Sequence, residues 1–138
     1  MMAGKHLAAT LLATVLLFPG LPAFADQTVV ERWYAALVTV DEDALSNLLA
    51  EDAEMKLLDL GVVQSKPEFL ASLDEWREAA KGLVVRHRVE GTEDGVTTVL
   101  ACYDFPANDV LMRETFAISG TRIVENIQTR LAESCEAY

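Results

Sequence analysis

The second half of the chain alternates between apolar and polar residues in four consecutive runs, and this alternation limits the possible folds more than any other feature. A period of two is typical of strands with one buried and one exposed face. The predicted strands cover residues 83–91, 96–105, 110–119 and 122–131. Turn-forming segments join them at residues 94–95, 106–109 and 119–120. Connections this short favour an antiparallel meander.

The first half has mainly helical periodicity. The predicted elements are helices over residues 27–38 and 41–50, strands over 53–60 and 62–64, and a third helix from 65 to about 81. Ser65-Lys66-Pro67-Glu68 is a capping box that marks the start of the third helix. The order α-α-β-β-α-β-β-β-β predicts an α+β fold in which three helices pack on one face of a curved, mainly antiparallel sheet.

Residues 1–25 have the three parts of a secretory signal peptide. Lys5 and His6 form a short basic region, an uncharged apolar run from Leu7 to Phe18 follows, and Ala23-Phe24-Ala25 supplies small residues for cleavage. A run of roughly 12 apolar residues is too short to span a bilayer. We therefore predict an exported protein, periplasmic or secreted, with one mature domain over residues 26–138 and no membrane attachment after cleavage.

The composition argues against several classes of partner. The chain has 22 acidic and 11 basic residues and a formal charge of −11, and loss of Lys5 with the signal peptide leaves 22 against 10, or −12. A phosphate backbone would be repelled, so nucleic acid is not an expected partner. We predict no metal and no cofactor, because the sequence has no close His/Cys/Asp cluster, Gly-rich phosphate loop or nucleophile elbow.

Cys102 and Cys135 are the only cysteines. In an oxidising compartment two cysteines more often form a disulfide than remain free thiols. Geometry decides whether they can form the bond. The alternatives are therefore a buried Cys102 with an unpaired Cys135, or a bridge between two subunits.

The stretch Val29-Val30-Glu31-Arg32-Trp33-Tyr34-Ala35-Ala36-Leu37, followed by residues 41–53, resembles the opening helices of the nuclear transport factor 2-like superfamily. Its SnoaL-like and ketosteroid isomerase-like branches are the most similar. The strand before Gly61, the short strand and capped helix after it, and the closing Ile123-Val124-Glu125-Asn126 fit the same pattern. The resemblance implies a cone-shaped α+β barrel with an apolar pocket at its open end, and a homodimer formed through the outer sheet face. Because this fold hosts enzymes and binding modules alike, it implies no single function.

The resemblance to ketosteroid isomerases carries over one of three catalytic groups. Where that branch has an oxyanion-binding tyrosine on the first helix, this chain has Trp33, with Tyr34 beside it. The position of the general-base aspartate holds Leu57, and Asp59 lies two residues further along the same strand face. The neutral carboxylic acid of the penultimate strand corresponds to Glu114.

The facing of His87, the only histidine of the mature domain, depends on the hairpin that follows it. A three-residue turn with Gly95 in a bulge places His87 inside with Val99, Ala101 and Tyr103, whereas a two-residue turn exposes it. We favour the inward position because it buries more carbon. Arg86 and Arg88 then lie outside, where we expect cross-strand acids to pair with them.

These faces predict the residues of the site. The catalytic candidates are Glu114, His87 and Asp59, and the expected ligand-pocket residues are Trp33, Tyr34, Leu57, Phe69, Trp76, Tyr103, Phe116, Asn126 and Gln128. A few convergent polar groups in an apolar pocket are typical of a ligand site. We favour a non-catalytic module that binds a small apolar or amphipathic molecule, because Leu57 replaces the base. The alternative is a cofactor-free lyase, isomerase, cyclase or dehydratase in which Glu114 and His87 form an acid–base pair.

Overall fold

The computed structural model describes residues 22–138, so the predicted signal peptide lies, except for its last residues, outside the described part. The elements are α1 (Pro22–Thr39), α2 (Glu42–Leu48), β1 (Leu49–Leu57), the 3₁₀ helix η1 (Leu58–Leu60), β2 (Val62–Ser65), α3 (Lys66–Ala71), α4 (Leu73–Ala79), β3 (Val84–Glu93), β4 (Val96–Asp104), β5 (Asp109–Ser119) and β6 (Arg122–Ala132). The predicted α+β class is confirmed. Within residues 22–138, no helix has both the length and the apolar character needed to cross a membrane.

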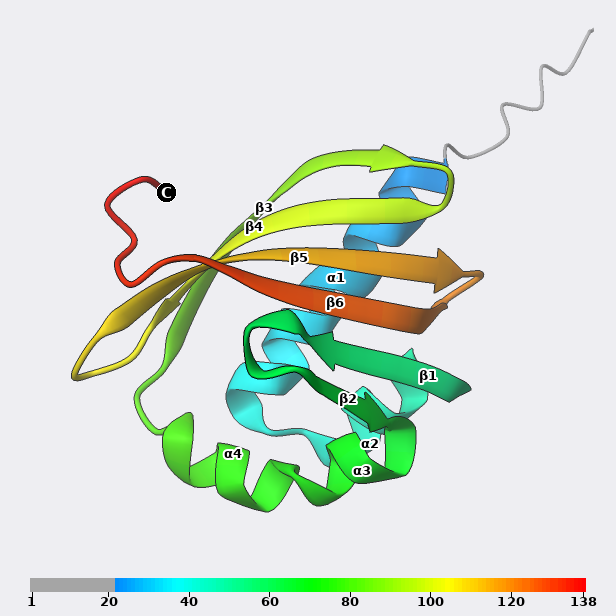
Figure 1. Ribbon diagram of the computed structural model, residues 1–138. Coiled ribbons are helices and arrows are strands. Elements are labelled where there is room, and N and C mark those ends of the chain that lie inside the picture. The colour runs from blue at the N-terminus through cyan, green and yellow to red at the C-terminus, as the bar shows by residue number, and fades with distance from the viewer. Residues whose placement is uncertain (1–21) are drawn as a thin grey trace, which may run out of the picture.

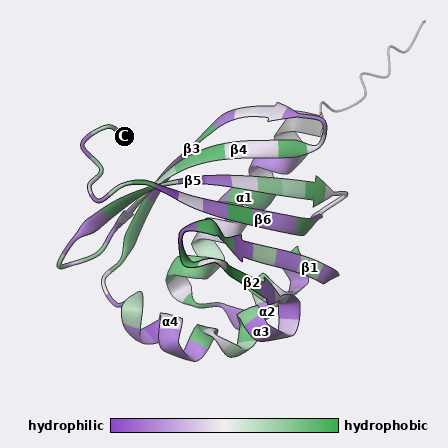
Figure 2. Ribbon diagram, viewed as in Figure 1, coloured by the Kyte–Doolittle hydropathy of each residue, from purple (hydrophilic) through white to green (hydrophobic). Residues whose placement is uncertain are grey.

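One curved, six-stranded sheet organises the domain, with the strand order β2-β1-β6-β5-β4-β3 (Figure 1). The four C-terminal strands form the predicted antiparallel meander. Strand β1 joins the meander parallel to β6, and β2 pairs antiparallel with β1 at the sheet edge. Hydrophobic and hydrophilic residues alternate along β1 and β6, as expected for strands with one buried face (Figure 2).

The helices cover one face of this sheet. Helix α1 buries a stripe at helical spacing that includes Val30, Trp33 and Leu37. The Trp33 ring stacks on Phe69 of α3 with centroids 5.4 Å apart and meets the edge of Phe116 of β5 at 6.1 Å. One continuous hydrophobic core therefore connects α1, α3 and the inner face of the sheet.

Several predicted boundaries in the first half of the chain are wrong. The second helix ends at Leu48 instead of residue 50, because Leu49 is extended and pairs with Ile123 of β6. The first strand consequently runs over Leu49–Leu57, and residues 58–60 form η1. The predicted third helix is two helices separated by Ser72, whose hydroxyl donates a hydrogen bond of 2.6 Å to the carbonyl oxygen of Phe69. That bond competes with the regular helical ladder.

The β3–β4 hairpin has a different turn from the predicted one, although His87 lies on the expected face. Asp94 and Gly95 form a two-residue turn with φ values of 51° and 76°, which suits a type I′ hairpin. A register shift between Val89 and Gly91 compensates for the shorter turn. His87 therefore lies opposite Ala101, in register with the inward-facing residues.

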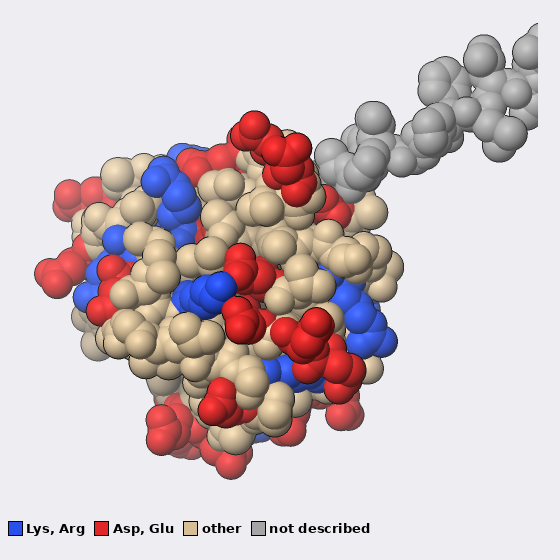
Figure 3. Space-filling view, turned by 45° about the vertical axis from the view of Figure 1, so that its right-hand side comes forward, with Lys and Arg blue, Asp and Glu red and all other residues tan. Residues whose placement is uncertain are grey.

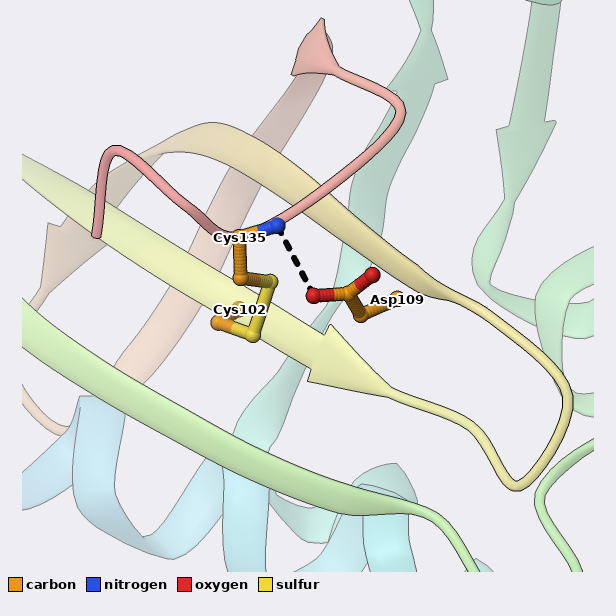
Figure 4. A group of neighbouring side chains, drawn as sticks. All are labelled: Cys102, Asp109 and Cys135. Carbon is orange, nitrogen blue, oxygen red and sulfur yellow. Dashed lines mark hydrogen bonds between the residues drawn. A yellow bond between two sulfur atoms is a disulfide. The ribbon is translucent and has the colours of Figure 1, made fainter.

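The segment after β6 is fixed to the outer sheet face by a disulfide between Cys102 and Cys135 (Figure 4). Asp109 Oδ2 accepts a hydrogen bond of 2.9 Å from the Cys135 amide. Beyond it, the Tyr138 ring lies under the guanidinium groups of Arg86 and Arg88, at 4.8 and 4.9 Å from its centroid. The expected cross-strand acids are not there, because Arg86 lies opposite Cys102 and Arg88 opposite Leu100.

Candidate functional site

A cavity of about 470 Å³ lies between helices α3–α4 and the inner face of the sheet. Its wall is mainly apolar, and every strand except β3 contributes to it. The lining residues are Leu37, Met55, Leu57, Gln64, Phe69, Ser72, Leu73, Glu75, Trp76, Ala79, Tyr103, Phe105, Val110, Met112, Gln128 and Arg130. This volume is within the range of small-molecule sites.

Three aromatic side chains form one wall of the cavity. The Trp76 ring meets Tyr103 and Phe105 edge-on at centroid distances of 6.4 and 6.2 Å, and Tyr103 and Phe105 stack at 6.4 Å. Trp76 Nε1 donates a hydrogen bond of 2.9 Å to the carbonyl oxygen of Leu37. Because this bond fixes the indole, the aromatic wall is organised before any ligand arrives.

A buried polar network lies behind this wall. Glu114 is fully buried, and its carboxylate accepts hydrogen bonds from the Tyr103 hydroxyl at 2.5 Å and Asn126 Nδ2 at 3.1 Å. Gln128 Nε2 donates to Asn126 Oδ1 at 2.9 Å. Since Tyr103 and Gln128 line the cavity, the network connects the buried acid to the cavity wall at two points.

Burial controls the protonation of this network. It raises the pKa of Glu114, and the hydrogen bonds from Tyr103 and Asn126 partly offset the rise. Burial, followed by the nearby charge of Glu114, raises the pKa of Tyr103 and of Tyr34 well above the ordinary value. Both tyrosines therefore stay protonated at neutral pH, and Tyr103 is a hydrogen-bond donor to Glu114.

The other two catalytic candidates lie elsewhere. His87 is half-buried and stacks on the Tyr34 ring at 4.4 Å, outside the cavity wall. Burial lowers the pKa of His87, although the charge of Glu31 opposes this, so the imidazole is neutral at pH 7. Asp59 is exposed in η1 and accepts a hydrogen bond of 2.6 Å from the Arg130 amide. The structure thus does not unite Glu114, His87 and Asp59 in one acid–base site.

The expected pocket residues divide into two groups. Leu57, Phe69, Trp76, Tyr103 and Gln128 line the cavity. By contrast, four expected residues are buried beneath the lining instead of forming it, namely Trp33, Tyr34, Phe116 and Asn126. The close packing of α1 against β5 fills the space that they would otherwise face.

Sequence reasoning missed several wall residues, including the charged Glu75 and, on β6, Arg130. Arg130 lies two residues beyond Gln128 on β6, so the alternation that placed Asn126 and Gln128 inside could also have placed Arg130. Arg130 and Asp59 also line a smaller recess of about 130 Å³, which shares Leu57, Met112 and Gln128 with the main cavity.

The described residues contain one group with the spacing of a metal site, formed by Cys102, Asp109 and Cys135. Its two sulfur atoms are bonded to each other, so the group offers a single carboxylate (Figure 4). A lone carboxylate does not meet the coordination needs of a transition metal.

No family model and no curated protein matches the sequence. Solved structures do match the fold. A SnoaL-like protein from Burkholderia thailandensis has a TM-score of 0.67 and 19% identity, over 83% of this chain and all (100%) of that chain. The chain has the NTF2-like fold. IdmH from Streptomyces antibioticus, a proposed polyketide cyclase, matches this fold with a TM-score of 0.63 and 14% identity, over 75% and 90% of the two chains. A proposed ketosteroid isomerase from Kribbella flavida matches with a TM-score of 0.64 and 10% sequence identity, over 79% of this chain and 79% of that chain.

Proposed function

We propose that this NTF2-like domain binds a small apolar or amphipathic molecule in the main cavity and releases it unchanged. The observation that carries the proposal is the separation of the buried acid from the cavity. The wall is mainly aromatic and aliphatic, and Glu114 lies behind it, hydrogen-bonded to Tyr103 and Asn126. Similarity in fold to proteins named as a polyketide cyclase and a ketosteroid isomerase supports a small organic ligand.

Acid–base catalysis is poorly served by this arrangement. A general base must lie within hydrogen-bond reach of the proton that it removes. Leu57, which corresponds to the base by the resemblance to ketosteroid isomerases, cannot accept a proton, and His87 and Asp59 lie outside the main cavity wall. The one polar group of the network with a reactive proton at the wall is the Tyr103 hydroxyl, and its proton is already donated to Glu114.

A direct binding measurement tests the proposal. The neutral fluorophore 1-pyrenebutyramide should bind the protein with a micromolar dissociation constant, seen as a rise in fluorescence. Leu57→Trp adds an indole to the cavity wall and should abolish this binding. Val84→Trp is the matched control, because Val84 is exposed on β3 and does not line the cavity. Equal binding by both variants would contradict the proposal, provided that both unfold cooperatively.

The short hydrogen bond between Tyr103 and Glu114 favours a second candidate, an isomerase, cyclase or dehydratase. Protonation of Glu114 would reverse this bond and free the Tyr103 proton for a substrate oxygen. Incubation with β-tetralone in D₂O, followed by NMR, separates the two functions. We expect no exchange above the buffer rate. Stereospecific exchange that Glu114→Gln removes would establish the enzyme instead.

A further inference from the structure

Among residues 22–138, Arg130 is the only basic residue on the wall of the main cavity. It lies opposite Met112 of β5, in the alternating series that also turns Asn126 and Gln128 toward the interior. Its side chain is exposed, so it lies at the mouth of the cavity and not in its depth. An arginine at this position keeps its charged group hydrated at the mouth while its side chain contributes to the wall of a mainly apolar cavity.

The Arg130 guanidinium has no acidic partner within residues 22–138. The ion pairs there are made by Lys56, Lys66, Lys81 and Arg113. Asp59 is beside Arg130 in the fold, yet its carboxylate binds the Arg130 main-chain amide. Acidic side chains are plentiful on the surface (Figure 3), and the chain has twice as many acidic as basic residues, 22 against 11. Arg32 and Arg77 make no ion pair there either, so Arg130 is distinguished by its position on the cavity wall and not by the missing partner alone.

Besides Arg130, the sheet side of the wall has two residues with polar amide side chains. Gln64 on β2 and Gln128 on β6 line the cavity from strands that flank β1. The aromatic wall is supplied by α4 and by β4 with the residue that follows it, elements on other sides of the cavity. A ligand that reaches the mouth of this cavity can thus contact aromatic surface with its body and the Arg130 guanidinium, with Gln128 two residues before it on β6, with one end.

We propose that the ligand is a carboxylic acid with a flat apolar body, bound with its carboxylate on Arg130. This inference rests on the proposed function and deepens it. The planar guanidinium donates two parallel N–H groups that match a carboxylate. Glu75 of α4 is the only acid that the described part of the chain places on the main cavity wall, and its charge repels a ligand carboxylate from the helical side. The recess carries Asp59, whose engagement with the Arg130 amide leaves the guanidinium available.

The net negative charge of the protein repels an anionic ligand. Binding of a carboxylate therefore depends on the nearby positive charge of Arg130. Repulsion from distant acids is screened over about 10 Å at 0.1 M salt, whereas contact with Arg130 is not. Removing Arg130 should therefore leave an acid ligand at a disadvantage relative to a neutral one of the same shape.

A matched pair of probes tests the inference. 1-Pyrenebutyric acid and 1-pyrenebutyramide have the same number of heavy atoms and differ in charge. The wild-type protein should bind the acid about threefold more tightly, because an ion pair with an exposed guanidinium contributes about 0.7 kcal/mol. Arg130→Gln should reduce this ratio to one or less while changing the affinity for the amide less than about twofold. Arg113→Gln should retain the wild-type ratio, since Arg113 pairs with Glu90 and does not line the cavity.

The outcomes separate the ligand class from the function. Equal affinity of the wild-type protein for both probes, or a ratio that Arg130→Gln leaves unchanged, would overturn the carboxylate and leave the binding function standing. Tighter binding of the cationic analogue 1-pyrenebutylamine would also overturn it and would assign the recognition to Glu75. Absence of binding for all three probes, or amide binding that Leu57→Trp does not affect, would overturn the proposed function itself.

Discussion

Loss of the Cys102–Cys135 disulfide is expected to lower the free energy of unfolding by about 3.7 kcal/mol. The bond joins residues separated by 33 positions in the chain. For a loop of this length, the chain-entropy relation gives a restriction of the unfolded state of about 12.5 cal/mol/K, which corresponds to about 3.7 kcal/mol at 25 °C. The suitable variant is Cys102→Ala/Cys135→Ala. Serine at position 102 would add the separate cost of a buried hydroxyl, because Cys102 is fully buried.

Urea titrations followed by far-UV circular dichroism measure the effect. The unfolding free energy of the wild-type protein should fall by about 3.7 kcal/mol when a reductant is added. The double variant should have this lower unfolding free energy both with and without reductant. With an unfolding entropy of about 2.1 cal/mol/K per residue, the predicted mature domain of 113 residues should melt about 15 °C lower. This length is the 138 residues of the chain without the 25 of the predicted signal peptide.

A control separates loop closure from the contacts of the tail. Tyr138→Ala removes the ring that lies under Arg86 and Arg88 and keeps the disulfide. This substitution should lower the free energy of unfolding by no more than about 2 kcal/mol, since cation–π contacts at exposed sites are weak. If oxidised and reduced wild-type proteins differ by less than about 1 kcal/mol, the loop-entropy argument is refuted, and the unfolded chain must already be restricted in some other way.

Two further predictions concern single residues. Because burial raises the pKa of Glu114, the wild-type protein should gain stability relative to Glu114→Gln as the pH falls from the folded-state pKa toward about 4.5. Urea titrations between pH 7.5 and 5 measure the unfolding free energies of both proteins. A difference between them that does not change with pH would contradict this prediction. Gly82→Ala should lower the unfolding free energy by about 1–3 kcal/mol, because a Cβ there would lie 2.8 Å from Pro106 Cγ at a φ of +75°; an unchanged melting curve would show that this loop yields freely.

Periodicity predicted the sheet side of the domain well. Burial of one face forces alternate residues inward, so Glu114 and Asn126 are found buried as their positions in the strands indicate. The facing of His87 was predicted correctly with an incorrect turn, since the irregularity near Glu90 restores the register that the two-residue turn alone would shift. Burial of the apolar residues of the strand determined which way His87 faces, and the irregularity near Glu90 adjusted the backbone to that facing.

The helical side and the depth of the cavity were harder to predict. Leu48 and Leu49 are both buried, and a short apolar run fits a helix end as well as a strand start until the partner strand is known. Periodicity gives the face of a residue but not its depth. Trp33 and Phe116 face inward as expected, yet their rings fill the core instead of lining the cavity, because their positions depend on how closely α1 approaches the sheet.

The parallel pairing of β1 with β6 has a consequence for the order of folding. Met55 pairs with Asn126, so the sheet cannot be completed until the last strand has left the ribosome. Until then, the edges of β1 and β5 that β6 later occupies are free, and a chain that ends before Arg122 is a candidate for edge-to-edge aggregation. Pairings this distant in sequence also slow folding. For a chain predicted to carry an export signal, late completion of the sheet keeps the newly made polypeptide open and threadable through a translocation channel until its synthesis is finished.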